Sequence, residues 1–147
     1  MPKMIKGKNT GNSRIGVQIA NPLVPVEDAK AIEEALGIGI DAPGGATNVE
    51  YYVLSGKIAD IRFNCDGHDY TFRASESNED FAGLNGKEIS SEKLDTDKKA
   101  TLTVIASGES RWTKIDWKEG KIAFVIVNTD GASEDEIKAV FEKIRNR

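Results

Sequence analysis

The stretch WTKIDWKEGKIAFVIV, residues 112–127, predicts a β-hairpin, and the rest of the chain can be placed around it. If Glu119-Gly120 forms a two-residue turn, the facing pairs are Trp117 with Ile122, Ile115 with Phe124 and Thr113 with Ile126. These pairs make one face of both strands apolar, and a slip of one residue would move them to opposite faces. We therefore expect this hairpin to form the middle of the core sheet.

The composition is that of a soluble globular domain. Of the 147 residues, 39% are hydrophobic and 30% are charged, which excludes a largely disordered chain. The sequence has no run of about 18 apolar residues, so no membrane-spanning helix is predicted. The only cysteine, Cys65, excludes an internal disulfide and a cysteine-cluster metal site. We expect no cofactor and no bound metal.

The charge is distributed unevenly along the chain. Residues 1–14 carry four basic side chains and no acid, so residues 15–147 carry a net charge of −8, against −4 for the whole chain. This pattern predicts a flexible basic tether over 1–14 and a single α+β domain over 15–147. The acidic domain argues against a nucleic-acid partner. We expect a monomer, and a membrane contact only through an N-terminal anchor outside this sequence, because residues 1–14 lack the apolar segment of a signal peptide.

Residues 14–75 predict a short strand, a helix and a three-strand meander. Alternating apolar residues indicate a strand over 14–20, and helical spacing indicates a helix over 26–36. In the meander over 47–75, the Asp66-Gly67 turn pairs Phe63 with Tyr70, Ile61 with Phe72 and Ala59 with Ala74. The same register places Asp60 opposite Arg73, and a three-residue loop around Ser55-Gly56 joins the first two strands.

The second half of the chain completes the predicted sheet. Residues 76–100 are expected to form a long acidic connection, followed by a strand over 101–107. A Gly108-Glu109 turn then places Leu102 opposite Ile115 and Val104 opposite Thr113, and a capping box at Ser133 opens an amphipathic helix. The predicted fold class is α+β. A single antiparallel sheet of about six or seven strands is covered by a short N-terminal helix and a C-terminal amphipathic helix.

The residues most often used in catalysis each have a structural interpretation here. His68, the only histidine, is interpreted as a solvated residue of the Asp66-Gly67 hairpin. Cys65 falls on the apolar side of its strand, which favours burial over reactivity. Glu134, Asp135 and Glu136 begin a helix, where the exposed amides and the helix dipole favour carboxylates. We therefore predict that the protein is not an enzyme.

The candidate binding residues are aromatic or apolar side chains: Trp112, Phe81, Leu84 and Tyr52. Trp112 falls on the face opposite Trp117, with Ile105 and Val127 as expected neighbours. Either that face is also covered, or it exposes an aromatic patch that would mark a binding surface. Phe81 and Leu84 belong to the 76–100 connection, and connections of that length are either functional or mobile.

The order of short motifs along residues 20–146 resembles a bacterial domain of unknown function found outside the cytoplasmic membrane. The motifs that carry the resemblance are Asn21-Pro22, Ala35-Leu36-Gly37-Ile38, Ile58-Ala59-Asp60-Ile61, Ile115-Asp116-Trp117, Lys118-Glu119-Gly120-Lys121 and the C-terminal amphipathic helix. Such domains occur in small lipoproteins and as the outer domains of anti-sigma-factor-like membrane proteins. The resemblance implies an extracytoplasmic or membrane-anchored location and supplies no catalytic residues.

Three hypotheses about function follow. The first is a non-enzymatic extracytoplasmic domain that binds or senses an unknown envelope protein or ligand through the Trp112 face or the 76–100 segment. The second is a carrier of a small lipophilic ligand, held between the sheet and the C-terminal helix near Phe124 and Phe141. The third is an enzyme that uses dispersed carboxylates such as Asp60, Asp116 and Glu119. A cytoplasmic location is the alternative to an extracytoplasmic one.

Overall fold

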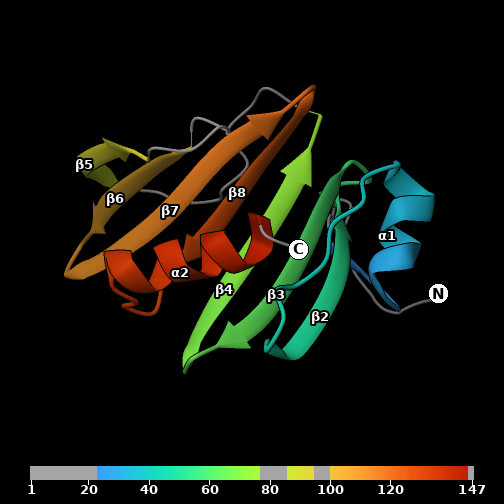
Figure 1. The fold of residues 1–147 in the computed structure, drawn as a ribbon, viewed down its shortest axis with the longest axis horizontal. Coiled ribbons are helices and arrows are strands. Elements are labelled where there is room, and N and C mark those ends of the chain that lie inside the picture. The colour runs from blue at the N-terminus through green and yellow to red at the C-terminus, as the bar shows by residue number, and fades with distance from the viewer. Residues whose placement is uncertain (1–22, 77–85, 95–99, 146–147) are drawn as a thin grey trace, which may run out of the picture.

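The computed structural model describes residues 23–76, 86–94 and 100–145, which form an antiparallel sheet and two helices (Figure 1). The elements are β1 (Leu23–Val26), α1 (Ala29–Leu36), β2 (Thr47–Leu54), β3 (Ile58–Cys65), β4 (His68–Ser75), β5 (Lys87–Lys93), β6 (Thr101–Ser107), β7 (Ser110–Glu119), β8 (Ile122–Asn128) and α2 (Glu134–Arg145). The predicted α+β class is confirmed. The predicted strand number is wrong, because the sheet has eight strands within the described residues alone.

The sheet consists of two runs of hairpins joined at one non-sequential pairing. The strand order is β1-β2-β3-β4-β8-β7-β6-β5, so β4 pairs with β8 although more than 45 residues separate them in the sequence. The pairing runs from Tyr70 opposite Asn128 to Ser75 opposite Ala123. The β7–β8 hairpin therefore lies inside the sheet, as predicted from its apolar pattern.

Two of the predicted registers are confirmed residue by residue. In β3–β4, Ile61 faces Phe72 and Asp60 faces Arg73 across the Asp66-Gly67 turn. In β6–β7, Leu102 faces Ile115 across the Gly108-Glu109 turn. The three-residue loop before β3 is also confirmed, because Leu54 pairs with Ile58.

The predicted register of the β7–β8 hairpin is wrong by two residues. The turn is Gly120-Lys121 instead of Glu119-Gly120, so Trp117 faces Phe124 and Val127 faces Lys114. Gly120 adopts φ +62°, which suits a glycine at the first central position of a two-residue hairpin turn. A shift of two residues keeps every side chain on its predicted face, because the pleat repeats every two residues.

The two edge strands were not predicted from the sequence. β1 begins before the predicted first helix and shares only Val26 with it, and α1 starts only at Ala29, where Asp28 accepts a hydrogen bond from the Ala31 amide at 2.9 Å. β5 lies within the 76–100 segment, pairs with β6 and is exposed along its whole length. Both are edge strands with no apolar alternation to reveal them. The predicted strand over 14–20 and the tether over 1–14 lie outside the described residues.

Both helices pack on the same face of the sheet. Figure 1 shows α2 lying across β7 and β8, and α1 at the other end beside β2. Ile137, Val140 and Phe141 form the buried stripe of α2, and Ile32 is the fully buried residue of α1. The hydrophobic core lies between these helices and the apolar sheet face. The centre of the opposite face is also buried, with Val125 among its buried residues.

A substitution at Phe141 tests the contact between α2 and the sheet. Its side chain is fully buried, and its ring meets Trp117 edge-on with a centroid distance of 4.9 Å. We expect Phe141→Ala to lower the free energy of unfolding by about 3–5 kcal/mol, because the lost contacts leave a cavity. Urea unfolding followed by tryptophan fluorescence measures the loss. The control Ile89→Ala removes a half-exposed side chain and should change the free energy of unfolding by only about 0.5 kcal/mol. Equal losses of stability in the two variants would contradict the burial of Phe141 between α2 and the sheet.

Candidate functional site

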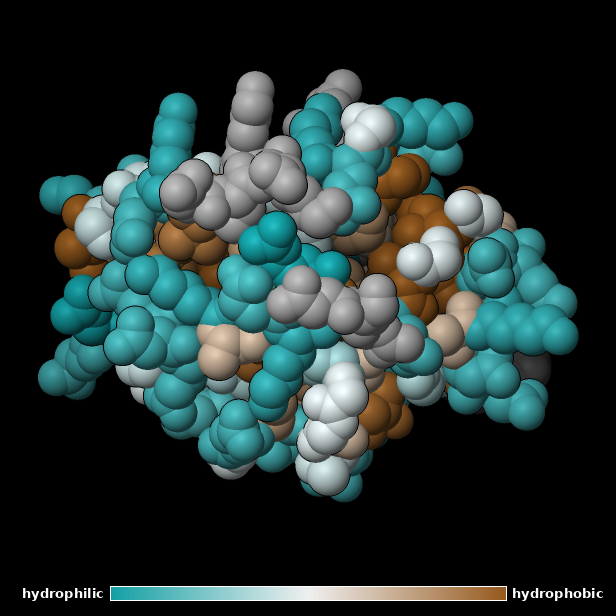
Figure 2. Space-filling model, viewed as in Figure 1, coloured by the Kyte–Doolittle hydropathy of each residue, from teal (hydrophilic) through white to brown (hydrophobic). Residues whose placement is uncertain are grey.

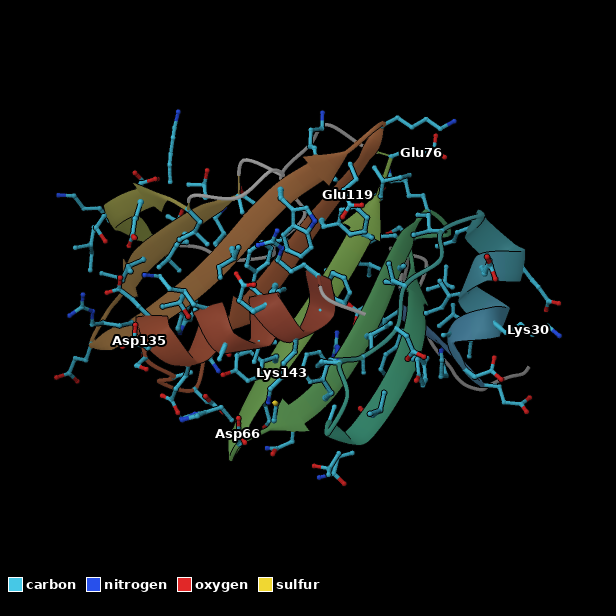
Figure 3. The ribbon with its side chains drawn as sticks, viewed as in Figure 1. Lys30, Asp66, Glu76, Glu119, Asp135 and Lys143 are labelled. Carbon is cyan, nitrogen blue, oxygen red and sulfur yellow. The ribbon has the colours of Figure 1, made fainter. Side chains whose placement is uncertain are left out.

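A pocket opens between the C-terminal end of α2 and the sheet. Its volume is ≈ 250 Å³, and its walls come from residues 39–41, from β4, β7 and β8, and from the last turn of α2. Figure 2 shows hydrophobic surface on this side of the molecule, among polar groups. Figure 3 places Glu119, which lines the pocket, at the far end of β7 from the start of α2. The pocket therefore lies at the C-terminal end of α2, between the helix and the sheet.

Three neighbouring strands supply an aromatic floor to this pocket. Trp117 and Phe124 face each other across β7 and β8 and stack at a centroid distance of 5.2 Å. Phe72 on β4 stacks against Trp117 at 6.0 Å and against Phe124 at 6.2 Å. The three rings lie on the same face of the sheet, because side chains directly opposite each other on neighbouring strands, and side chains two residues apart on one strand, share a face. Phe124 and Ile144 remain partly exposed, so the pocket presents apolar surface to a ligand.

The mouth of the pocket carries charged groups that already have partners. Glu119 accepts a hydrogen bond from Trp117 Nε1 at 3.1 Å. Asp41 accepts one from the Tyr51 hydroxyl at 2.7 Å, and Arg145 lies 3.4 Å from Glu142. An apolar floor with a few fixed polar groups at its edge is typical of small-molecule sites.

The residues proposed from the sequence do not converge on this pocket. Trp112 and Tyr52 both lie on the opposite face of the sheet, partly buried, and Ile105 faces Trp112 as predicted. Three strands separate them, which corresponds to about 19 Å at the usual strand spacing. The Tyr52 hydroxyl donates to Glu50 at 3.0 Å. Phe81 and Leu84 lie outside the described residues.

The carboxylates named for the enzyme hypothesis are also spread out. Asp60 and Asp116 point to the face opposite the helices, whereas Glu119 belongs to the pocket. Asp60 is fully buried; its Oδ1 lies 3.0 Å from Arg62 Nε and its Oδ2 lies 2.8 Å from Arg73 Nε. A buried carboxylate between two guanidinium groups is neutralised by them, so this predicted cross-strand pair has a structural role.

His68 takes part in a cluster that sequence analysis missed. Its Nδ1 lies 2.9 Å from Asp130 Oδ1, and its Nε2 lies 3.1 Å from Glu136 Oε2. The interpretation of His68 as a solvated turn residue is therefore wrong. Asn128 fixes the position of Asp130 with a hydrogen bond of 2.7 Å, and the Asp69 amide donates to the same carboxylate at 2.7 Å. The cluster links β4 to the first turn of α2.

The cluster favours a positively charged His68. The hydrogen bond to Asp130 raises the pKa of His68 above its ordinary value, and Glu136 raises it further. Partial burial alone would raise the pKa of Asp130, but hydrogen bonds from Asp69, Asn128 and His68 lower it. The hydrogen bond from the Ser133 amide lowers the pKa of Glu136. Because both ring nitrogens are occupied by carboxylates, His68 acts here as a cationic link rather than as a free base.

Two further expectations concern Cys65 and the start of α2. Cys65 is buried, as predicted, and its Sγ lies 3.7 Å from Lys143 Nζ. Figure 3 shows Lys143 near Asp66 at the end of the β3–β4 hairpin. The capping box is confirmed, because Ser133 and Glu136 exchange hydrogen bonds of 2.8 and 3.1 Å.

No protein-family model, no curated protein and no solved structure matches the chain. Within 23–76, 86–94 and 100–145, no group of three or more His, Cys, Asp or Glu residues is placed to hold a metal ion. No helix among these residues has the length and apolar character needed to cross a membrane.

The His68 cluster makes stability depend on pH. Because the pKa of His68 is raised on folding, its contribution is fully present below its ordinary value of 6.5 and is lost as pH rises through the folded value. The pKa values of Asp130 and Glu136 are lowered on folding, so these two groups stabilise the fold above their ordinary values of 3.8 and 4.5. This stabilisation is lost as the pH falls below those values. We expect the stability difference between wild type and His68→Gln to shrink as pH rises from about 6 to about 9.

Urea unfolding at several pH values measures this difference, and an NMR titration of His68 gives its pKa directly. Asp130→Asn should lower the pKa of His68 toward its ordinary value, because a partner of the imidazolium is lost. The control Asp135→Asn changes an acid in the first turn of α2, next to Glu136, that has no hydrogen bond to His68, and it should alter this pKa far less. If the difference in the free energy of unfolding between the wild type and His68→Gln stays constant with pH, the proposed link is disproved.

Proposed function

We propose that this chain is a non-enzymatic binding domain that takes a small, largely apolar ring compound in the pocket between α2 and the sheet. The aromatic floor of Phe72, Trp117 and Phe124 carries the proposal. Phe124 is the partly exposed ring of this floor, on which a flat ring can stack, and the buried rings of Trp117 and Phe72 pack against it. Of the functions considered, a carrier or sensor of a lipophilic ligand is therefore the one that the geometry favours.

The size of the pocket limits the ligand. An apolar cavity of about 150 Å³ is known to hold benzene, so a pocket of ≈ 250 Å³ is suited to a single ring with a short substituent. The carboxylates of Asp41 and Glu119 at the mouth favour a ligand that donates a hydrogen bond. A phenol-like compound meets both conditions.

The resemblance noted in the sequence supports an extracytoplasmic, membrane-anchored location, where such a domain would sense a ligand of the cell envelope. That location is part of the proposal. Fractionation of source cells and the intact mass of the endogenous protein test it, because a lipid-modified or membrane-associated species would support it and an unmodified cytosolic species would contradict it. Binding of an envelope protein through the Trp112 face or the 76–100 segment stays a separate prediction.

Phenol is a suitable probe for the pocket. The indole N–H of Trp117 donates to Glu119, and both residues line the pocket, so the ¹⁵N-resolved indole signal of Trp117 reports on a bound ring. We expect phenol to shift this signal saturably and to leave the indole signal of Trp112, on the opposite face, unchanged. The variant Trp112→Phe assigns the two signals.

Filling the pocket should abolish this response. Ile144→Tyr places a larger side chain at the pocket wall, and we expect it to weaken phenol binding by about tenfold or more, which corresponds to about 1.4 kcal/mol. Ile89→Tyr makes the same change on the exposed edge strand β5 and should leave binding unchanged. Equal phenol affinity in the two variants, or parallel shifts of both indole signals in the wild type, would refute the proposed site.

A further inference from the structure

A second pocket lies at the opposite end of α2. Its volume is ≈ 280 Å³, and its walls come from β6, β7 and the segment that leads into α2. Its lining residues include Val104, Arg111, Thr113, Ala132 and Glu134. Asp135, labelled in Figure 3, marks this end of the helix. The two pockets share no lining residue, so their occupancy can be tested separately.

Thr113 gives this pocket an unusual buried polar group. The residue is 5% exposed, and its Oγ1 is the buried side-chain oxygen or nitrogen without a hydrogen-bond partner in the described part of the chain. Such a group is unfavourable, since it has lost its hydrogen bonds to water without replacement. Valine has nearly the same shape and would avoid this loss. A ligand that provides the missing hydrogen bond would remove this cost.

Two charged side chains line the same pocket without pairing. Arg111 comes from β7, two residues before Thr113 and on the same face, and Glu134 comes from the first turn of α2. Within the described residues neither of them forms a salt bridge, and their charged groups are therefore not within salt-bridge distance of each other. The pocket thus offers a guanidinium and a carboxylate from two different elements.

The backbone at the start of α2 adds hydrogen-bond donors. The first N–H groups of a helix have no partner inside the helix, and the capping box with Ser133 satisfies that of Glu136. The amides of Glu134 and Asp135 are left to favour a carboxylate, together with Arg111. A simple anion would also meet repulsion from the Glu134 side chain. A ligand that carries an ammonium group beside its carboxylate satisfies both charges.

We propose that this pocket binds a small zwitterion of amino-acid size. Its carboxylate faces Arg111 and the first amides of α2, its ammonium group faces Glu134, and the Thr113 hydroxyl completes its hydrogen bonds. Val104 and Ala132 provide a small apolar wall for a short side chain. The volume of ≈ 280 Å³ exceeds the cavity of about 150 Å³ that is known to hold benzene, so an amino acid of modest size fits.

L-alanine, sodium propionate and propylamine hydrochloride separate the charges of the proposed ligand. Each is titrated into the ¹⁵N-labelled full chain at constant ionic strength and about pH 7, where L-alanine carries both charges. We expect L-alanine to shift the backbone amides of Ala132 and Ser133 saturably. Propionate and propylamine carry one charge each, and their affinities should be lower than that of L-alanine by at least about tenfold. Equal shifts with all three probes, or no shift with L-alanine at about 10 mM, would overturn the proposal.

Substitutions assign the three contacts. Arg111→Gln and Thr113→Val should each weaken L-alanine binding by about tenfold, whereas Thr113→Ser keeps the hydroxyl and should retain most of it. Glu134→Gln should weaken L-alanine binding and strengthen propionate binding, because the repulsion of a lone carboxylate disappears. Asp135→Asn, the matched control in the same turn, should leave the selectivity between the probes unchanged.

The hydroxyl provides a second, independent check. Because Thr113→Val removes the unpaired group, the variant should fold with a stability equal to or above that of the wild type while losing L-alanine binding. Retained L-alanine binding in folded Thr113→Val would overturn the proposed role of the hydroxyl. The phenol-responsive indole of Trp117 should be unaffected by all of these variants, so failure at one pocket leaves the other open to its own test.

Discussion

The pairing of β4 with β8 is the contact on which the rest of the structure depends. It joins the N-terminal strands β1–β4 to the C-terminal strands β5–β8, and no short turn supports it. Its stability must come from side chains packed across the junction. Phe72 on β4 stacks on Phe124 of β8 and on Trp117 of β7, and Phe141 of α2 closes over the stack from above. Long-range strand pairing costs more chain entropy than a hairpin does, and the buried aromatic area at this junction offsets that cost.

The same aromatic stack explains why a pocket forms where it does. α2 covers the stack at Phe141, and the last residues of the helix, Ile144 and Arg145, line the pocket together with Phe124. Residues 39–41 approach from the other side and leave a gap between themselves and the helix end. The residues that hold the two halves of the sheet together therefore also form the floor of the candidate site. A variant that disturbs this floor changes stability and binding together, so the pocket is better tested at its wall.

Local patterns predicted the hairpins well and the long-range contacts poorly. The Asp66-Gly67 turn fixes its register through the backbone conformation that these residues favour, and the facing pairs were correct. At the β7–β8 turn, Glu119-Gly120 and Gly120-Lys121 both keep the apolar faces aligned, so alternation alone could not distinguish them. His68 shows a different limit, because its partners Asp130 and Glu136 are more than 60 residues away and no local pattern connects them. The sequence also could not predict that Arg111 and Thr113 line a pocket, because that pocket forms only where the start of α2 packs against β6 and β7.

α2 is the element that both candidate pockets share. Its first turn forms a wall of one pocket and its last turn a wall of the other. Between them the helix is fixed to the sheet by Phe141, and the link from His68 to Glu136 fixes its first turn to β4. Loss of the charge on His68 at higher pH would loosen that first turn while the buried contacts of Phe141 persist. The pocket at Thr113 therefore lies beside the pH-dependent link, whereas the aromatic pocket lies at the other end of the helix, near the buried contact of Phe141.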